Sequence, residues 1–148
     1  MAGDRPVSDD ARVQRVVQFF ENLSLPRLDA LHEIYAAEAR FIDPFNDANG
    51  LDAIRRVYAH MYEQLEQPRF RIQLAALEQD AALVLWTFSF RRRGRAQTER
   101  IDGTSELRFG ADGRLLLHRD HWDPQPVYDM VPLLGAALRW LRRRLSAR

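Results

Sequence analysis

The stretch FRIQLAALEQDAALVLWTFSF, residues 70–90, decides the fold of this chain. Its apolar residues recur with the period of β-strands, which predicts strands over residues 70–77 and 82–90. In the second run, large aromatic residues alternate with small polar ones. The aromatic residues are Trp86, Phe88 and Phe90. One strand face is therefore strongly aromatic and belongs to the core, and the part of it nearest an opening would contact a ligand.

The regions on either side complete an α+β pattern. Two more strands are expected over residues 98–109 and 115–122, joined by the turn signal Asp112-Gly113. Upstream, apolar residues at helical spacing predict three helices and, before the third, a short strand. The helices cover residues 13–23, with Ser8 or Asp9 as cap, 28–35 and 54–65, and the strand covers residues 39–43. Helices followed by hairpins favour helices packed on one face of an antiparallel sheet.

A helical tail follows the last strand, over residues 125–148. Apolar residues between Val131 and Leu145 recur at helical spacing opposite arginines. We expect this tail to pack across the opening of the fold or on the neighbouring sheet. With 148 residues, the chain is predicted to form a single domain over residues 1–148.

The composition excludes several classes of function. The 22 basic and 21 acidic residues nearly cancel, so we expect no nucleic-acid partner. The sequence contains no cysteine and no lysine, which removes thiolate nucleophiles, disulfides and Schiff-base lysines. Catalysis would use carboxylates, histidines, hydroxyls or arginines, and we expect neither a cofactor nor a metal. No stretch has the character of a membrane span or a signal peptide, so the sequence predicts a cytoplasmic protein without stable membrane association.

Several short motifs lie along residues 13–123 in a recognisable order. They are LDAL at 28–31, IYA at 34–36, FIDP at 41–44 and LRF at 107–109. Together with three helices, a short strand and four long strands, they resemble the nuclear transport factor 2-like superfamily, which includes ketosteroid isomerases, limonene epoxide hydrolases and SnoaL-like polyketide cyclases. The resemblance implies a cone-shaped α+β fold, in which a curved antiparallel sheet wraps around three N-terminal helices, plus a C-terminal helix. It also implies a small, largely apolar pocket, and the superfamily's many functions leave the reaction open.

The closest local match is to the ketosteroid isomerases. The aspartate before the proline is the general base of those enzymes, and Asp43 occupies that position. Their helix-one tyrosine falls on Phe19, and their neutral aspartic acid falls on Ser105 or, with a two-residue bulge, on Asp102. A phenylalanine has no proton to donate. The resemblance therefore implies a base without the oxyanion donors of a standard ketosteroid isomerase.

The segment RDHWD, residues 119–123, resembles the end of the last strand in limonene epoxide hydrolases. Asp120 matches their catalytic aspartate, but the strand that carries their arginine and second aspartate is apolar here, which argues against a standard epoxide hydrolase. His118, Asp120 and Trp122 share one strand face. This face is the better pocket candidate, because Trp122 needs burial. In the alternative, Asp120 forms an ion pair with Arg119 or His118 on the sheet surface.

Asp43 has the same strand parity as Phe41, so it points toward the pocket if Phe41 points into the core. A carboxylate held there suits a general base. In the alternative, Asp43 starts the loop and its side chain bonds its own backbone. Tyr58, on the third helix, is predicted to line the same cavity. The full set of predicted pocket residues is Phe19, Phe41, Tyr58, Trp86, Phe88, Asp102, Ser105 and Trp122.

Two functions of different class follow from these residues. In the first, the chain is an enzyme for a small apolar molecule, an isomerase, cyclase or hydratase, with Asp43 as general base and Asp120 or His118 in support. In the second, the chain is a non-catalytic ligand-binding protein or a dimeric scaffold. A homodimer is expected in either case, because in this superfamily the outward sheet face commonly packs on a second copy.

Overall fold

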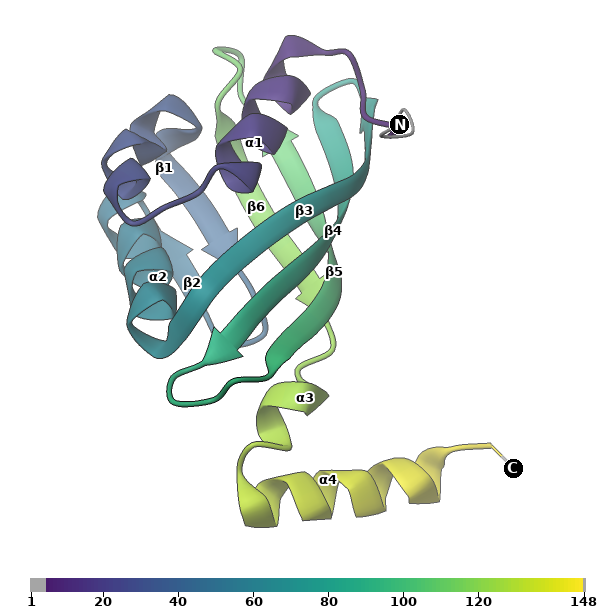
Figure 1. Ribbon diagram of the computed structural model, residues 1–148. Helices are drawn as coiled ribbons and strands as arrows, with labels where there is room; N and C mark the ends of the chain where they lie inside the picture. Colours follow the sequence, from purple (N-terminus) through teal and green to yellow (C-terminus); the bar gives the residue numbers. More distant parts are fainter. Residues whose placement is uncertain (1–4, 148) are drawn as a thin grey trace.

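One curved, unclosed sheet of six strands forms the frame of the molecule (Figure 1). The computed structural model describes residues 5–147, in which the strands lie in the order β2-β1-β6-β5-β4-β3. The strands are β1 (Tyr35–Ile42), β2 (Asp47–Asn49), β3 (Leu65–Glu78), β4 (Ala81–Arg92), β5 (Thr98–Phe109) and β6 (Leu115–Trp122). The predicted α+β class with a curved sheet is confirmed.

One pair of neighbouring strands departs from the antiparallel pattern. β1 runs parallel to β6, whereas every other pair in the sheet is antiparallel. The prediction of a wholly antiparallel sheet is therefore wrong at this pair. Parallel strands need a long connection, and the segment between β1 and β6 contains α2 (Leu51–Gln64) and three long strands.

The three N-terminal helices lie on one side of the sheet (Figure 1). Helix α1 (Ala11–Glu21) begins after Asp10, whose side chain accepts a hydrogen bond from the Arg12 amide at 2.9 Å, so the predicted caps are one or two positions early. The second helix is a 3-10 helix, η1 (Pro26–Glu33). Helix α2 starts after Gly50, whose positive φ of 85° suits glycine.

Several boundaries differ from the prediction because strand pairing decides them. Tyr35, expected at the end of the second helix, begins β1 and pairs with Leu115. Helix α2 ends at Gln64, and β3 follows at once through Pro68, where its pairing with β4 is irregular. The predicted turn at Asp112-Gly113 joins β5 to β6, with Gly113 at a φ of 81°.

The core lies between the helices and the inner face of the sheet. The aromatic residues of β4 predicted to face inward, Trp86, Phe88 and Phe90, are all buried. They belong to one cluster with side chains of α1, α2 and β1. Because aromatic side chains bury large apolar areas, this cluster fixes the helices on the sheet and so positions the site described below.

The C-terminal tail divides into two helices, α3 (Gln125–Tyr128) and α4 (Pro132–Leu145). Helix α4 stands away from the sheet in Figure 1 and exposes its apolar residues, with Leu133 87% exposed. An ion pair between Arg139 and Asp129, at 2.6 Å, holds it beside α3. The expectation that the tail packs on the opening or on the sheet is therefore wrong for α4. No helix within residues 5–147 is long and apolar enough to cross a membrane.

Candidate functional site

A cavity of about 600 Å³ lies between the inner face of the sheet, α2 and α3. This volume is in the range of sites for drug-sized molecules. Most of the lining is apolar, and five predicted pocket residues contribute to it: Phe41, Tyr58, Trp86, Phe88 and Trp122. Val127 and Met130, from α3 and the turn after it, also line the cavity. The two carboxylates in the lining are Asp43 and Asp120.

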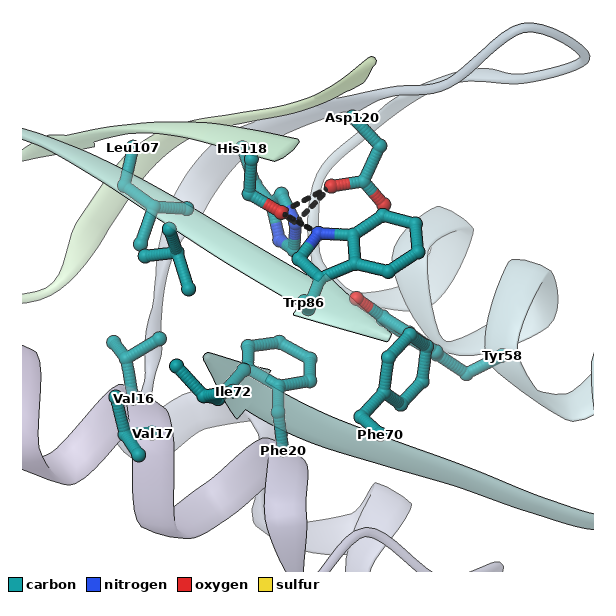
Figure 2. Close-up of a pocket in the computed structure, with 12 residues that line it drawn as sticks. Val16, Val17, Phe20, Tyr58, Phe70, Ile72, Trp86, Leu107, His118 and Asp120 are labelled. Carbon is teal, nitrogen blue, oxygen red and sulfur yellow. Dashed lines mark hydrogen bonds and ion pairs between the residues drawn. The ribbon is translucent and has the colours of Figure 1, made fainter. Parts of the chain in front are cut away.

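Six side chains form a hydrogen-bonded chain at one end of the cavity, which we call the inner polar network. In order along the chain, they are Tyr58, Tyr35, His118, Asp120, Ser105 and Trp86. The two phenol oxygens are 2.9 Å apart, and the Tyr35 oxygen lies 2.6 Å from Nδ1 of His118. On the other side of the imidazole, Nε2 lies 2.7 Å from Oδ1 of Asp120. Figure 2 shows His118, Asp120 and Trp86 converging at this point.

Ser105 joins the indole of Trp86 to the carboxylate of Asp120. Its hydroxyl donates to Oδ1 of Asp120 at 2.5 Å and accepts from Nε1 of Trp86 at 2.8 Å. Ser105 and His118 are buried, and the side chain of Asp120 is only 13% exposed. Asp120 does pair with His118, as one alternative held, but the pair points into the molecule and does not lie on the sheet surface.

The donors and acceptors of the inner polar network match along its whole length when His118 carries its proton on Nε2. Nε2–H then donates to Asp120, Tyr35 donates to Nδ1, and Tyr58 donates to Tyr35. This tautomer is assigned from the partners of the two ring nitrogens. Both bonds to Asp120 end on Oδ1, and no residue within 5–147 donates to Oδ2. The second oxygen is therefore the one that the network leaves unbonded, on a residue that lines the cavity.

Burial keeps the two tyrosines of the network neutral. Removal from water raises the pKa of Tyr35 well above its usual value, and this effect exceeds that of its hydrogen bond with Tyr58. Burial likewise raises the pKa of Tyr58, and the nearby Tyr35 and Asp120 raise it further. Both phenols therefore keep their protons and stay hydrogen-bond donors at neutral pH.

Gly103 leaves the space that the Trp86 indole occupies. It lies directly opposite Trp86 on β4 and opposite Trp122 on β6. A Cβ atom at this position would lie 2.3 Å from an atom of the Trp86 ring. Only glycine therefore allows the ring to lie where its Nε1 reaches Ser105.

On α1, the residue at the site is one position away from the predicted one. Phe19 is buried, but it lies outside the cavity lining and packs beneath the guanidinium of Arg27. Phe20, which also lies outside that lining, packs on the inner polar network instead, with its ring centroid 5.4 Å from that of His118 and 6.0 Å from that of Tyr58. Since each residue of a helix turns by about 100°, a shift of one position moves a side chain to another face.

The structure decides between the two candidates on β5. Ser105 faces inward, whereas the side chain of Asp102 is 67% exposed on the outer face of the sheet, so its prediction as a pocket residue is wrong. There Asp102 accepts a hydrogen bond from the Thr87 hydroxyl at 2.8 Å and pairs with Arg100. The Thr87 bond and the Arg100 bonds lower the pKa of Asp102. The odd separation of positions 102 and 105 places these residues on opposite faces of the strand.

Asp43 lies in the loop between β1 and β2, which borders the cavity and which we call the rim. Its Oδ1 accepts hydrogen bonds from the amides of Phe45 and Asn46, both at 2.7 Å, and from the Asn46 side chain at 3.0 Å. This is the arrangement of the alternative in which the aspartate bonds its own loop. Because Asp43 also lines the cavity, its role as general base stays a prediction.

Two members of the site carry little signal in the sequence. Tyr35 falls in a stretch predicted as helix, and only its pairing with Leu115 turns it into the first residue of an inward-facing strand. Gly103 has no side chain for a hydrophobic pattern to reveal. Its parity with Ser105, two positions along β5, is the one signal that places it on the inner face.

The fold and the site together define a class of protein. A curved sheet around N-terminal helices, with an apolar cavity and a few polar groups at its inner end, is the cone-shaped architecture of nuclear transport factor 2-like proteins. The SnoaL-like domain model matches residues 16–118, and the chain belongs to this SnoaL-like family. The resemblance inferred from the sequence is confirmed. A comparison with curated proteins gave no significant match.

Solved structures share the fold at low sequence identity. A nuclear transport factor 2-like protein of unknown function from Burkholderia pseudomallei is 16% identical, with a TM-score of 0.73 over 83% of this chain and 98% of that chain. A protein with a ketosteroid isomerase-like fold from Catenulispora acidiphila, in complex with trimethylamine, is 14% identical, with a TM-score of 0.71 over 82% and 92%. A candidate SnoaL-like polyketide cyclase from Shewanella putrefaciens is 15% identical, with a TM-score of 0.70 over 85% and 99%. Such likeness establishes the fold and leaves the reaction open.

Proposed function

We propose that this protein is an enzyme that binds one small, largely apolar molecule in its cavity and uses Asp120 to transfer a proton on that molecule. The observation that carries the proposal is the carboxylate of Asp120, which is held on one oxygen by His118 and Ser105 and lines the cavity. A carboxylate fixed in this way can take a proton without first rearranging its surroundings. Asp120 is therefore the general base of the proposal, with His118 and Ser105 as the residues that position it.

The chemistry that suits this site is removal of a proton from a carbon next to a carbonyl group. Oδ2 of Asp120 takes the proton, and the electron pair of the broken C–H bond passes into the enolate of the substrate. Return of the proton to another carbon completes an isomerisation. Attack of the enolate carbon on a second carbonyl, followed by protonation of the new alkoxide by Asp120, completes a cyclisation. Both sequences restore the carboxylate.

Tyr58 supplies the neutral donor that an enolate oxygen needs. Its side chain lines the same cavity, and it keeps its proton because burial raises its pKa. Its hydrogen can turn from Tyr35 to an oxygen of the substrate, while Tyr35 continues to donate to His118. A preorganised donor of this kind contributes about 3 kcal/mol to transition-state stabilisation.

The relatives support a role with small molecules. They include a candidate polyketide cyclase and a protein in complex with trimethylamine. Asp43 remains the second carboxylate of the cavity, but both of its oxygens accept hydrogen bonds within its own loop, Oδ1 from the amides of Phe45 and Asn46 and Oδ2 from the Asn46 side chain at 3.0 Å. We therefore assign Asp43 to shaping the rim and Asp120 to the proton transfer.

Proton transfer can be tested before the natural substrate is known. The ketone 2-tetralone is small and apolar and has acidic hydrogens next to its carbonyl, and NMR in heavy water follows their replacement by deuterium. We expect the protein to accelerate this exchange and Asp120→Asn to lower the rate by about 100-fold or more. Asp43→Asn, the matched control on the same cavity, should retain most of the rate.

Two results would contradict the assignment of Asp120. One is exchange that continues unchanged in Asp120→Asn, and the other is exchange abolished by Asp43→Asn alone. Urea unfolding of each variant separates a loss of chemistry from a loss of folding. Quenching of tryptophan fluorescence measures binding of 2-tetralone, and binding without exchange would favour the alternative function, a non-catalytic ligand-binding protein.

We also propose that two copies of the chain pair through the outer face of the sheet. Leu83 and Leu85 on β4 are 54% and 41% exposed, and they lie beside Ala76 and Leu74 of β3. A contiguous apolar patch of this kind favours a protein interface. Light scattering should give twice the mass of one chain, and Leu85→Glu should return it to that of a monomer. A wild-type protein that stays monomeric at micromolar concentration would exclude this dimer.

A further inference from the structure

The cavity has a long axis, and strand β4 marks it. Trp86, Phe88, Phe90 and Arg92 share one strand face, and all four line the cavity. Because a strand rises by about 3.3 Å per residue, Arg92 lies roughly 20 Å along the strand from Trp86. Trp86 belongs to the inner polar network beside Asp120, so Arg92 marks the opposite, outer end.

Helix α2 runs along the same axis in the same sense. Tyr58, in the inner polar network, and Gln64, at the end of the helix, both line the cavity. The turn after β4 closes on this end of the helix, because Arg93 donates to the backbone carbonyls of Glu63 at 2.5 Å and Tyr62 at 3.0 Å. Two independent elements therefore place the arginines at the outer end and Asp120 at the inner end.

At the outer end of the cavity, Arg92 and His60 each lie beside a carboxylate, whereas Arg93 does not in the described part of the chain. Arg92 forms an ion pair with Glu99 at 2.8 Å, and His60 lies 3.5 Å from the carboxylate of Glu63. Arg93 also lines the cavity, but its hydrogen bonds go to backbone carbonyls, and within residues 5–147 it forms no ion pair. These bonds use Nε and Nη2 and leave Nη1 available. Arg93, whose side chain is exposed, thus presents a fixed positive charge at the outer end, which we take as the opening of the cavity.

We propose that the natural ligand is an elongated carboxylic acid, whose carboxylate binds Arg93 at the opening and whose apolar body extends to Asp120. This inference rests on the proposed function and adds the class of ligand to it. The opposite orientation would bring a second carboxylate against Asp120 in an apolar surrounding, where like charges repel strongly. With Arg93 at one end and Asp120 at the other, the cavity should bind such an acid in one orientation. In that orientation, the end of the ligand far from its carboxylate lies against Oδ2 of Asp120.

A matched pair of probes tests the charge requirement. Decanoic acid and 1-decanol have the same chain length and differ in the charge of one end, and tryptophan fluorescence reports the binding of each. We expect the acid to bind about 10-fold more tightly than the alcohol, because charge-assisted hydrogen bonds to arginine are the stronger kind. Added salt should weaken binding of the acid and leave binding of the alcohol unchanged.

Substitutions in the turn after β4 test whether Arg93 is the group that binds the carboxylate of the acid. Arg93→Gln should lower the affinity for the acid about 10-fold, to that of the alcohol, whereas Arg93→Lys should retain the preference for the acid. Arg95→Gln, on the same turn but outside the cavity lining, is the matched control and should change neither affinity. Because Arg93 also binds the end of α2, the urea midpoint of each variant is measured alongside.

The possible failures are distinguishable. Equal affinity for the acid and the alcohol, or a preference for the acid that Arg93→Gln leaves intact, would overturn the inference and leave the proposed function standing. Binding of 2-tetralone without binding of decanoic acid would do the same. If none of the three molecules bound, the small-molecule cavity of the proposed function would itself be rejected, and this inference with it.

Discussion

Asp120 and Asp43 line the same cavity, and the chain holds them in different ways. Asp120, at the inner end, is fixed by Ser105 on β5 and by His118 on its own strand. Asp43, at the rim, is bound by the amides and side chain of its own loop within three residues. The position of the Asp120 carboxylate therefore depends on the assembled sheet, whereas the position of the Asp43 carboxylate depends on the local backbone of its loop.

Because the two carboxylates are held differently, mutations near them should differ in their effect on stability. The inner polar network draws its members from β1, α2, β4, β5 and β6, and all of them lose water on burial. A buried polar group without its partner destabilises the fold by much more than an exposed one. We therefore expect mutations at the inner end to act on stability and chemistry together, and mutations at the rim to act weakly on stability.

The largest effect is expected from His118→Ala. This change removes one of the two hydrogen-bond partners of the Tyr35 hydroxyl and one of the two partners of the Asp120 carboxylate, and it opens a space among the aromatic rings of Phe20 and Phe41. We expect a loss of about 3–5 kcal/mol in the free energy of unfolding, measured with urea.

The control for this variant is His121→Ala on the same strand. The His121 side chain is 57% exposed, so its removal should change stability by less than about 0.5 kcal/mol. Similar losses in the two variants would mean that the inner polar network contributes nothing beyond an ordinary polar surface.

Gly103→Ala should have the next largest effect. The added methyl group would lie 2.3 Å from the Trp86 ring, which must move away and lose its bond with Ser105. Overpacking of this kind costs about 1–3 kcal/mol. Urea unfolding measures the loss, and the tryptophan emission of the folded protein should shift. Unchanged emission and stability in Gly103→Ala would show that the indole does not depend on this space.

Much of this architecture is readable from the sequence. The alternation through Trp86, Phe88 and Phe90 predicts the inner face of β4 correctly, because a strand with one buried face has a period of two. The same rule places His118 and Asp120 on the inner face of β6. Strand residues were predictable because their direction depends on parity and little else.

The remaining parts of the site depend on pairing, which a single sequence does not specify. Tyr35 reaches His118 only because β1 lies parallel to β6, a contact between residues 83 positions apart. Phe20 replaces Phe19 because the exact rotation of α1 is set by packing. The choice of Ser105 over Asp102 needed the register of β5 against β6, which pairs Ser105 with Asp120.

The dependence of stability on alkaline pH gives a smaller and gradual test of the burial of Tyr35 and Tyr58. Burial raises the pKa of Tyr35 and Tyr58 in the folded protein, whereas in the unfolded chain a tyrosine loses its proton at about pH 10. Above that pH the unfolded state binds fewer protons than the folded state, so the free energy of unfolding falls as pH rises. The slope should reach about 1.4 kcal/mol per pH unit for each tyrosine, and Tyr35→Phe should remove its share.

The absorbance of tyrosinate provides the check on this prediction. The two buried tyrosines should ionise only when the protein unfolds, so part of the absorbance change should coincide with loss of the circular dichroism signal. Ionisation of all four tyrosines in a folded protein would contradict the burial of Tyr35 and Tyr58.

The smallest effect is expected at the rim, from substitutions of Asp43. Asp43→Asn keeps an oxygen that can accept from the amides of Phe45 and Asn46, so its stability should change by less than about 0.5 kcal/mol. Asp43→Ala removes that oxygen and should cost about 1 kcal/mol, the scale of a lost capping interaction. Urea unfolding distinguishes these values, and deuterium exchange of 2-tetralone, measured on the same samples, should be retained in both variants. If Asp43→Ala were as destabilising as His118→Ala, the rim would not be the locally organised region that its hydrogen bonds indicate. If Asp43→Asn were stable but inactive, the base would lie at the rim, and Asp120 would be the residue that positions the ligand.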